Sequence, residues 1–291
     1  MPGLTRRTFL GVAGGWMALR GAASPGEPAA ASVPRLCTIA YNVYGFRGWP
    51  ENRANRARRE AARGQMPARI ALELACYGPD IVTLSEADSE AAVAEVATHL
   101  DMNYAYLDGG FPGAILSRFP VLEHENHSLP SKDIDALEPF TRYAGRAVID
   151  APGGPVAVFS AHLHPRSRDL RLREIEQILA WLERDIESRA TFLVQGDLNH
   201  PPDTPEYAAW RDAGLVDAFA SKGVGVEGTV RSNKPTVRID YVWAHGPLAE
   251  TVRECRALYE GAFRVNPEDP TSFALSDHLP VLATFGELAQ P

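Results

Sequence analysis

Several apolar segments of this sequence end in a polar side chain that packing alone does not require. In the stretch TFLVQGDLNHPPDTPE, residues 191–206, a strand-like segment runs into Asp197 and Asn199, which stand two positions apart. Because side chains alternate between the two faces of a strand, this spacing predicts that both point the same way, and Pro201-Pro202 then ends the strand. Four further segments end in Asn42, Glu86, His162 and Asp240, and Asp277 and His278 precede the last segment.

Each of these residues alone is more simply interpreted as a turn former or cap, but together they form an unusual set. Strand ends in α/β proteins are where a rigid scaffold brings reactive groups together from distant parts of a chain. The oxygen atoms of Asn42, Glu86 and Asp277 are hard ligands that suit Mg²⁺, with Mn²⁺ as an alternative. The two histidines have neither cysteine partners nor HExxH spacing, so a zinc site is not predicted.

The hydrophobic pattern predicts the elements that must carry these residues. Helices are predicted at 67–76, at 89–100 with Ser89 as its N-cap, and at 169–188, where an apolar stripe recurs at helical spacing. A turn at 152–155 predicts a hairpin. Since strands occur both in hairpins and with intervening helices, the fold class is α/β, with mixed sheets covered by helices on their outer faces. Strands are predicted at 36–43, 80–84, 104–107, 113–116, 144–149, 156–161, 191–195, 237–244, 254–259 and 279–285.

Length and composition indicate an ordinary globular protein. The chain has 291 residues, 45% hydrophobic content and a formal net charge of −8, a charge that does not favour non-specific binding of nucleic acid. Six arginines between residues 47 and 63 are interpreted as a solvent-exposed face, with contact to an anionic substrate as the alternative. The three cysteines are interpreted as small buried side chains, although one pair could form a disulfide in an exported protein. Four further histidines are interpreted as surface residues: His124, His127, His164 and His200.

The first 31 residues have the pattern of an export signal rather than of a folded segment. Arg6 and Arg7 directly precede an apolar run at 9–19, which is too short to span a membrane and matches the core of a signal peptide. The adjacent arginines are typical of bacterial twin-arginine signals, with chance arginines in an unstructured tail as the alternative. Residues 1–31 are therefore predicted to be a signal peptide and linker, with the folded domain at 32–291 exported to the periplasm or the outside of the cell.

Seven short motifs also carry a family resemblance. AYNVYG, IVTLSEAD, GAILSRFP, FSAHLH, QGDLN, VRIDYVWA and LSDHLPV occur in the order found in the endonuclease/exonuclease/phosphatase superfamily, over residues 36 to 286. The chain therefore resembles deoxyribonuclease-like metal-dependent phosphoesterases, a group that includes nucleases, inositol polyphosphate phosphatases and sphingomyelinases. The resemblance implies a four-layered α/β sandwich, in which two mixed β-sheets pack face to face, helices cover the outer faces, and the active site lies at one edge.

The resemblance also implies how metal and water are held. Asn42 and Glu86 would be the main metal-binding pair, with Asp277 as an additional contact. Asp197, assisted by Asn199, would orient the attacking water and help to deprotonate it. These roles agree with what hydrolysis of a phosphate ester requires, namely an in-line water and a cation beside the charged equatorial oxygens.

Two histidines complete the implied site. His162 and His278 would hydrogen-bond the phosphoryl oxygens, and Asp240 would hold His278 and favour its imidazolium form. The sequence departs from the family pattern at Ser85, because family members commonly have Gln before the metal-binding Glu. Arg146 lies where many members have an arginine near the site, which predicts contact with substrate; a surface or ion-pair role is the alternative.

The predicted function is hydrolysis of phosphate esters by a phosphodiesterase or phosphatase, with an exported nuclease as the alternative. A non-catalytic binding protein of the same fold is a second alternative. The acidic charge and the scarcity of lysine weigh moderately against nucleic acid as a partner, although an arginine-rich loop could form a local basic patch. No apolar segment after residue 31 predicts membrane insertion, and the sequence does not indicate an oligomeric state. The second alternative is disfavoured because a non-catalytic relative would be expected to have lost at least one of Glu86, His162, Asp197, Asn199, Asp240 and His278.

Overall fold

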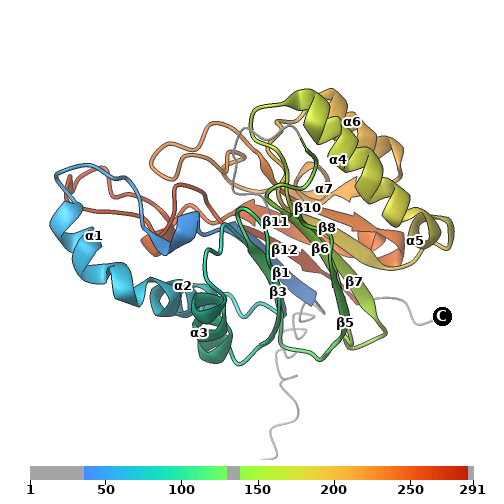
Figure 1. Ribbon diagram of the computed structural model, residues 1–291, viewed down its shortest axis with the longest axis horizontal. Helices are drawn as coiled ribbons and strands as arrows, with labels where there is room; N and C mark the ends of the chain where they lie inside the picture. The colour runs from blue at the N-terminus through green and yellow to red at the C-terminus, as the bar shows by residue number, and fades with distance from the viewer. Residues whose placement is uncertain (1–35, 130–137, 288–291) are drawn as a thin grey trace, which may run out of the picture. The chain divides into compact units, whose positions relative to one another are not determined.

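The computed structural model describes residues 36–129 and 138–287. The chain divides into two units, Met1–Ser32 and Val33–Pro291, and every described residue belongs to the second unit. The predicted signal peptide at residues 1–31 lies outside the described residues. Within the second unit, two sheets pack face to face with helices on their outer faces (Figure 1).

The first sheet has six strands and is mixed, as predicted. Only one pair of neighbours, β1 (Leu36–Asn42) and β2 (Ile81–Ser85), is parallel, with Asn42 opposite Ser85. This parallel pairing brings the carboxyl ends of β1 and β2 to the same edge. The other strands pair antiparallel in the order β11-β12-β1-β2-β4-β3, and they are β3 (Asn103–Leu107), β4 (Gly113–Ser117), β11 (Val252–Ala257) and β12 (Val281–Phe285).

The second sheet also has six strands and one parallel pair, β7 (Val156–His162) and β8 (Phe192–Asp197). The predicted hairpin is confirmed, because β6 (Tyr143–Ile149) pairs antiparallel with β7 and places Tyr143 opposite His162. The sheet order is β5-β6-β7-β8-β10-β9, where the remaining strands are β5 (Val121–Asn126), β9 (Val216–Asp217) and β10 (Asp240–His245).

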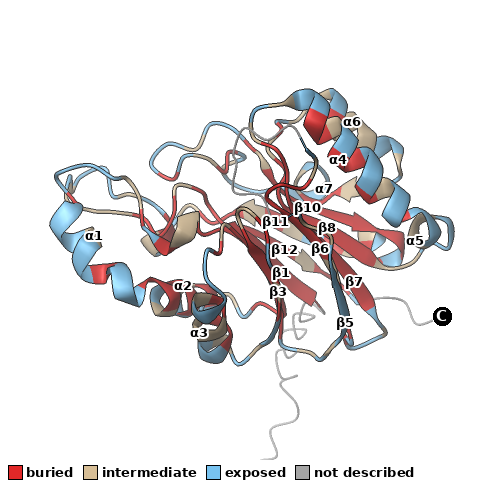
Figure 2. Ribbon diagram, in the orientation of Figure 1, coloured by how far each residue is buried: buried red, intermediate tan, exposed pale blue. Residues whose placement is uncertain are grey.

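Three buried clusters give the protein its layers. Between the sheets, side chains of both sheets form one buried cluster, which includes Ile115 of the first sheet and Val242 of the second. Outside the first sheet lie α2 (Met66–Ala75) and α3 (Glu90–Leu100), and outside the second lie α4 (Arg168–Trp181) and α6 (Pro205–Asp212). Most strands are therefore buried on both faces, as Figure 2 shows, whereas β5 at the edge of the second sheet is mostly exposed. The predicted four-layered α/β sandwich is confirmed.

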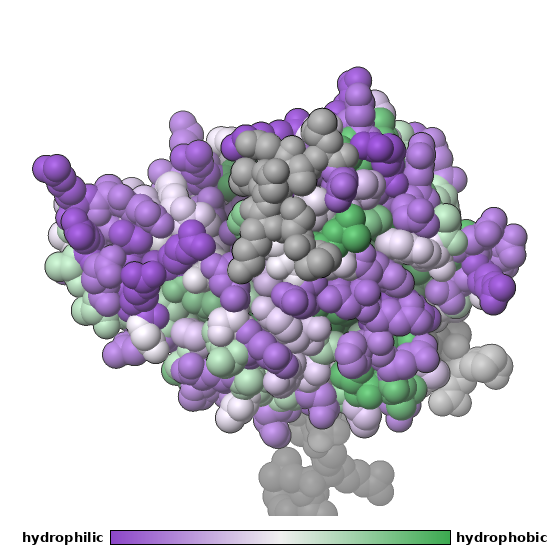
Figure 3. Space-filling view, viewed as in Figure 1, coloured by the Kyte–Doolittle hydropathy of each residue, from purple (hydrophilic) through white to green (hydrophobic). Residues whose placement is uncertain are grey.

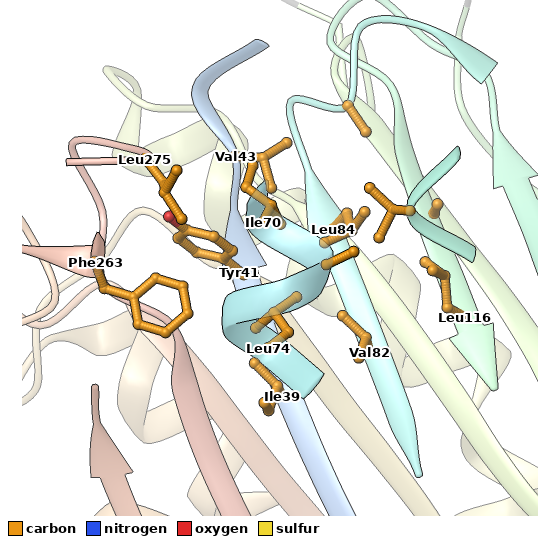
Figure 4. Close-up of a cluster of buried hydrophobic side chains, with 14 of the residues drawn as sticks. Ile39, Tyr41, Val43, Ile70, Leu74, Val82, Leu84, Leu116, Phe263 and Leu275 are labelled. Atoms are coloured by element: carbon orange, nitrogen blue, oxygen red, sulfur yellow. The ribbon is translucent and has the colours of Figure 1, made fainter. Parts of the chain in front are cut away.

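The layer between α2 and the first sheet illustrates how the pattern of apolar residues produces this packing. Ile70 and Leu74 of α2 stand four positions apart, one helical turn, and both are fully buried against Ile39 and Val82 of the strands (Figure 4). Truncating one of these side chains to alanine would cost about 2–5 kcal/mol of stability.

Local capping agrees with the sequence at one helix and departs from it at another. Ser89 is the N-cap of α3, and its hydroxyl accepts a hydrogen bond from the backbone N–H of Ala92 at 3.4 Å. The predicted helix at 169–188 is instead two helices, because Leu182 leaves helical geometry between α4 and α5 (Glu183–Glu187). The remaining helical segments are α1 (Arg56–Ala62), α7 (Ala218–Lys222) and 3₁₀ turns at Tyr44–Phe46, Arg63–Gln65, Gly246–Thr251 and Gly261–Phe263.

The arginine-rich segment at 47–63 includes α1 and faces solvent, and the surface over it is mostly hydrophilic (Figure 3). Four of its arginines form ion pairs within this part of the fold, for example Arg47 with Asp88 at 2.9 Å and Arg58 with Asp269 at 2.8 Å. This placement agrees with the interpretation of a solvent-exposed face. Exposed pairs of this kind contribute little to stability.

All three cysteines are free thiols, so the structure contains no disulfide between them. Cys37 and Cys255 are buried as predicted, but Cys76 is exposed at the end of α2. Among residues 36–129 and 138–287, no helix combines the length and apolar composition that crossing a membrane requires.

Two histidines that were interpreted as surface residues are buried. His200 is fully buried: its Nε2 accepts from Trp210 Nε1 at 3.3 Å, and its ring stacks on Tyr241. The Nδ1 of His164 accepts the backbone N–H groups of Arg166 and Ser167 at 3.2 and 2.9 Å. Both interpretations were wrong, because neither side chain lies in a solvent-exposed turn. Each ring instead accepts hydrogen bonds from N–H groups next to α4 or in α6.

Candidate active site

Both sheets deliver polar side chains to one edge of the sandwich. Asn42 ends β1 and Glu86 follows β2, while His162 and Asp197 end the parallel strands β7 and β8. Strand β10 runs antiparallel to β8, so its first residue, Asp240, lies directly opposite Asp197. The segment before β12 adds His278, which is bridged to Val230.

Close approach of the strands depends on glycine at one point. Gly196 has a φ of 138°, and a Cβ there would collide with the carbonyl oxygen of Ala161 on β7. Any side chain at this position would therefore push β8 away from β7. The glycine before Asp197 lets His162 and Asp197 stand beside each other.

The centre of the candidate active site is the carboxylate of Asp197. Its Oδ2 lies 3.6 Å from Nε2 of His162 and 3.8 Å from Nε2 of His278. Behind His278, the Oδ2 of Asp240 lies 2.9 Å from the other ring nitrogen, Nδ1. All four side chains are less than a tenth exposed. The arrangement places one carboxylate between two imidazoles, with a second carboxylate orienting one of them.

The surroundings give the two histidines opposite charge states. Burial lowers the pKa of His278, but the carboxylates of Asp240 and Asp197 outweigh this effect and raise it well above the ordinary value. Burial lowers the pKa of His162 well below the ordinary value, and the positive charges of Arg142 and His278 lower it further. These effects favour the cationic form of His278 and the neutral form of His162 at neutral pH.

Asp197 sits in an environment that makes it a stronger base than an ordinary aspartate. Burial raises its pKa, the negative charge of Asp240 raises it further, and the nearby His278 and the amide of Asn42 oppose the shift. A carboxylate with a raised pKa takes a proton from water more readily.

The predicted metal ligands lie beside this centre. The Nδ2 of Asn42 donates to Glu86 Oε1 at 3.2 Å and to Asp197 Oδ2 at 3.0 Å, while its Oδ1 accepts from the backbone N–H of Tyr44. Asn42 therefore orients two carboxylates at once. The backbone of Glu86 has a φ of 54°, an unfavourable conformation for a residue with a side chain and one often found at functional sites.

The donor set fits a hard divalent cation. Burial raises the pKa of Glu86 and of Asp277, and neighbouring carboxylates raise both further. Among the described residues, Asp277 Oδ1 and Asp240 Oδ1 are buried without a hydrogen-bond partner. Such oxygens require a cation or a water, and an all-oxygen set without cysteine suits an ion such as Mg²⁺.

A second group also has metal-like spacing. Single ligand atoms of Asp197, Asp240 and His278 lie within 4.8 Å of one another. The carboxylates of Asp240 and Asp197 raise the pKa of His278, which favours the protonated ring and disfavours this group as a metal site. Glu86, Asn42 and Asp277 therefore remain the predicted metal ligands.

Asn199 lies at the site but not for the reason that the sequence predicted. Strand β8 ends at Asp197, and Asn199 has a φ of 54°, so the alternation of a strand does not extend to it. Its backbone N–H donates to Asp197 Oδ1 at 3.1 Å, and its side-chain Nδ2 donates to the carbonyl of Leu163 at 2.9 Å. Asn199 thus orients Asp197 through its backbone and ties the loop after β7 through its side chain.

The structure does not bring Arg146 to the other site residues. Arg146 lies opposite Phe159 on the face of β6 that points to the outer helices. Its guanidinium lies 3.1 Å from Glu123 and 3.7 Å from Asp185 of α5. This position favours the alternative ion-pair role of Arg146 over the predicted contact with substrate, because its guanidinium already pairs with two carboxylates.

Arg142, which sequence reasoning did not single out, lies at the site instead. It immediately precedes Tyr143, the residue opposite His162, and it is only 2% exposed. Its guanidinium stands over the ring of Phe111 at 5.2 Å, and within the described part of the chain it forms no ion pair with a carboxylate. Burial lowers the pKa of Arg142, whereas the charges of Glu174, Glu86 and Asp197 raise it. A buried arginine without an ion-pair partner is well placed to bind an anion.

Ser85, the residue at which the sequence departs from the family pattern, belongs to a buried chain of hydroxyl groups. Its hydroxyl lies 2.9 Å from the hydroxyl of Tyr143, which in turn lies 2.9 Å from the hydroxyl of Ser160. This buried chain of hydroxyls joins the two sheets through Ser85, the residue before Glu86, and Tyr143, the residue opposite His162.

Comparisons with known proteins agree with this architecture. A model of the Endonuclease/Exonuclease/phosphatase family matches residues 39–278. A comparison with curated proteins finds no match. Among solved structures, an endonuclease/exonuclease/phosphatase family protein from Bacteroides thetaiotaomicron is 19% identical with a TM-score of 0.68, and the alignment covers 87% of this chain and 98% of that one.

Two other solved structures of similar fold have named activities. A mannosyl-6-phosphatase of Bacteroides thetaiotaomicron is 19% identical with a TM-score of 0.65, over 85% of this chain and 98% of that one. Sphingomyelinase C from Streptomyces griseocarneus is 19% identical with a TM-score of 0.66, over 87% and 100%. At this level of identity, the likeness to these structures shows the shared fold.

Proposed function

The chain belongs to the endonuclease/exonuclease/phosphatase family, and we propose that it hydrolyses phosphate esters by in-line attack of a water held at Asp197. Members of this family are divalent-metal-dependent phosphoesterases, and this chain is an enzyme of that class. The observation that carries the mechanism is the position of the Asp197 carboxylate between the Nε2 atoms of His162 and His278, at 3.6 and 3.8 Å.

Each residue has a distinct task in this proposal. Asp197, whose pKa is raised, accepts a proton from the attacking water while the backbone of Asn199 keeps its carboxylate in place. The cationic His278, held by Asp240, and the guanidinium of Arg142 bind the negative phosphoryl oxygens.

Neutral His162 donates a further hydrogen bond to the phosphoryl group from its Nε2. A divalent cation held by Glu86, Asn42 and Asp277, proposed to be Mg²⁺ or Mn²⁺, would neutralise charge on the phosphoryl oxygens. Positioning donors before the reaction removes the need to reorganise water around the growing charge.

We propose a small or lipid-linked phosphate ester as the substrate. A mannosyl-6-phosphatase and a sphingomyelinase share the fold, which supports this range of substrates without choosing among them. The net charge of −8 and the carboxylate partners of the exposed arginines in 47–63 weigh against a nucleic acid.

One assay panel tests the proposal. The protein is incubated with Mg²⁺, Mn²⁺ or EDTA and with bis-p-nitrophenyl phosphate, p-nitrophenyl phosphate, sphingomyelin or plasmid DNA. We expect metal-dependent hydrolysis of at least one ester and a loss of about 1,000-fold in Asp197→Ala. Asp203→Asn is the matched control, because Asp203 is exposed on the same loop. Activity that survives both EDTA and Asp197→Ala would exclude the mechanism, and hydrolysis of DNA alone would identify a nuclease.

We further propose that the twin-arginine pattern at Arg6 and Arg7 directs export to the periplasm or beyond. The support is the arginine pair before the short apolar run at 9–19. In a bacterium with twin-arginine export, changing both arginines to lysine should leave the protein in the cytoplasm. Equal amounts of both forms in the periplasmic fraction would contradict the proposal.

A further inference from the structure

Glu174 is a buried carboxylate on α4 with no part in the mechanism above. It is 1% exposed, and each of its oxygens accepts one backbone hydrogen bond. Oε1 accepts the N–H of Phe140 at 2.8 Å, and Oε2 accepts the N–H of His164 at 2.9 Å. One side chain therefore joins two loops that are far apart in sequence.

Both loops lead directly into the candidate active site. Phe140 is two residues before Arg142, at the start of β6, and His164 is two residues after His162, at the end of β7. Because β6 and β7 pair with Tyr143 opposite His162, the two loops leave the sheet at the same edge. The carboxylate of Glu174 holds both of them against α4.

The backbone at Phe140 needs this support. Its φ of 59° lies in the left-handed region, which is unfavourable for a residue with a side chain. The hydrogen bond to Glu174 and the packing of the ring on Trp181, with centroids 5.0 Å apart, hold this conformation. Relaxation of Phe140 to an ordinary conformation would turn the chain that leads to Arg142.

Arg142 and His162 are also joined on the side away from Glu174. The N–H of Gly110 donates to the carbonyl of Thr141 at 3.1 Å, and the guanidinium of Arg142 stands over Phe111. The ring of Phe111 meets His162 edge-on, with centroids 6.4 Å apart. A closed path of contacts thus runs from Glu174 through Arg142 and Phe111 to His162, and back through His164.

The α4 helix itself is firmly anchored. Arg171, one turn before Glu174, forms a buried ion pair with Glu206 of α6 at 2.8 Å. The same guanidinium donates to the carbonyl of His164 at 3.0 Å. Glu174 therefore projects from a helix that is held in place. A change in its side chain is expected to move the two loops rather than the helix.

We propose that Glu174 is a positioning residue, which holds Arg142 and His162 at the spacing that a phosphoryl group requires. This inference rests on the proposed function, because it takes Arg142 and His162 as the groups that bind the phosphoryl oxygens. In this role Glu174 acts through the two backbones that it joins.

The first test is Glu174→Gln, with Glu176→Gln as the matched control. Glu176 is exposed on the same helix, so the control makes the same chemical change without touching the loops. The new amide offers one accepting oxygen, and its NH₂ group faces the second backbone N–H, so one anchor is lost. Misplaced groups of this kind lower the rate, and we expect kcat to fall about 30-fold with KM changed less than about threefold. The control should retain wild-type kinetics.

Double variants separate positioning from general loss of stability. If Glu174 acts partly through Arg142, Glu174→Gln should have a clearly smaller effect on kcat/KM when Arg142 is already alanine. Equal fold losses in both backgrounds, measured well below the melting temperatures, would overturn the positioning of Arg142. If Glu174→Gln does not fold, Glu174→Asp replaces it: the shorter carboxylate keeps the charge but does not reach both loops.

A spectroscopic measurement distinguishes failure of this proposal from failure of the proposed function. Imidazole ¹⁵N–¹H spectra of the metal-free protein should show the signals of His162 shifted in Glu174→Gln and unchanged in Glu176→Gln. Unshifted His162 signals would overturn the positioning role, whether or not the protein hydrolyses any ester. Absence of hydrolysis by the wild-type protein, with His162 shifted in the variant, would count against the proposed function alone.

Discussion

Asp240 lies with its Oδ2 2.9 Å from Nδ1 of His278, although the two residues are 38 positions apart in the chain. The contact is buried and joins the first residue of β10 to the segment before β12. It determines which nitrogen of His278 faces Asp197 and keeps the ring protonated. One carboxylate thereby sets both the direction and the charge of a residue at the centre of the site.

Changing Asp240 to Asn should remove this charge and keep the fold. The pKa of His278 is raised above its unfolded value, so its contribution to stability is complete below pH about 6.5 and is lost as pH rises through the raised pKa. Without the Asp240 carboxylate, His278 should lose its proton at a lower pH, and turnover at neutral pH should fall about 100-fold or more. Steady-state kinetics and NMR titration of His278 measure the two effects, and unchanged turnover would remove the pair from the mechanism.

Arg142, just before β6, and Arg146, within β6, provide a matched pair of arginines. Arg142→Ala should lower kcat/KM about 10- to 100-fold, because a buried cation that binds the phosphoryl oxygens is lost. Arg146→Ala should change kcat/KM less than about twofold and stability by at most about 1 kcal/mol, since it loses only partly exposed ion pairs to Glu123 and Asp185. Assays with one ester substrate compare the two variants. An equal loss in both would restore Arg146 as a substrate contact.

Metal binding should stabilise the protein through Glu86. Addition of Mg²⁺ to EDTA-treated protein should raise its melting temperature, because a ligand that binds only the folded state stabilises it by mass action. Glu86→Gln should require at least about tenfold more Mg²⁺ for the same rise and for half-maximal activity. Thermal unfolding and isothermal calorimetry give readouts that are independent of turnover. A variant with wild-type Mg²⁺ affinity would place the metal elsewhere.

Glu174 should make the stability of the protein depend on pH. Burial raises its pKa from 4.5 to about 7, although the N–H groups of His164 and Phe140 and the charges of Arg142 and Arg171 oppose the shift. A carboxyl with a raised pKa contributes stability that is complete below pH about 4.5 and is lost as pH rises to about 7. The lost contribution is on the order of 3 kcal/mol.

Glutamine does not titrate, so the difference in unfolding free energy between wild type and Glu174→Gln isolates this effect. Between pH 5 and pH 8, we expect the wild type to lose stability relative to Glu174→Gln. Denaturant unfolding curves recorded at each pH measure this change. Parallel pH profiles of the two proteins would show that Glu174 does not titrate in this range. The carboxylate that anchors both loops is thus expected to destabilise the fold at the pH where it is ionised.

The register of the β6–β7 hairpin could have been predicted from the sequence, and it identifies the arginine beside the site. Once the turn at 152–155 pairs Ile149 with Val156, the register places Tyr143 opposite His162. That register assigns Arg142 to the site edge, whereas Arg146 lies opposite Phe159 in the strand interior. The strand pairing therefore favours Arg142 over Arg146 as the arginine beside the site.

The sequence by itself determined the layers, the strand ends and the types of residue that stand there, since these depend on local periodicity, turn residues and motifs. Only the tertiary structure decided how those residues act on one another. Burial and the charges of distant segments make His278 a cation and His162 neutral. A left-handed turn redirects Asn199, and a carboxylate on α4, Glu174, reaches both loops beside the site. These properties depend on atoms that are close in space and far apart in the chain, so no local pattern records them.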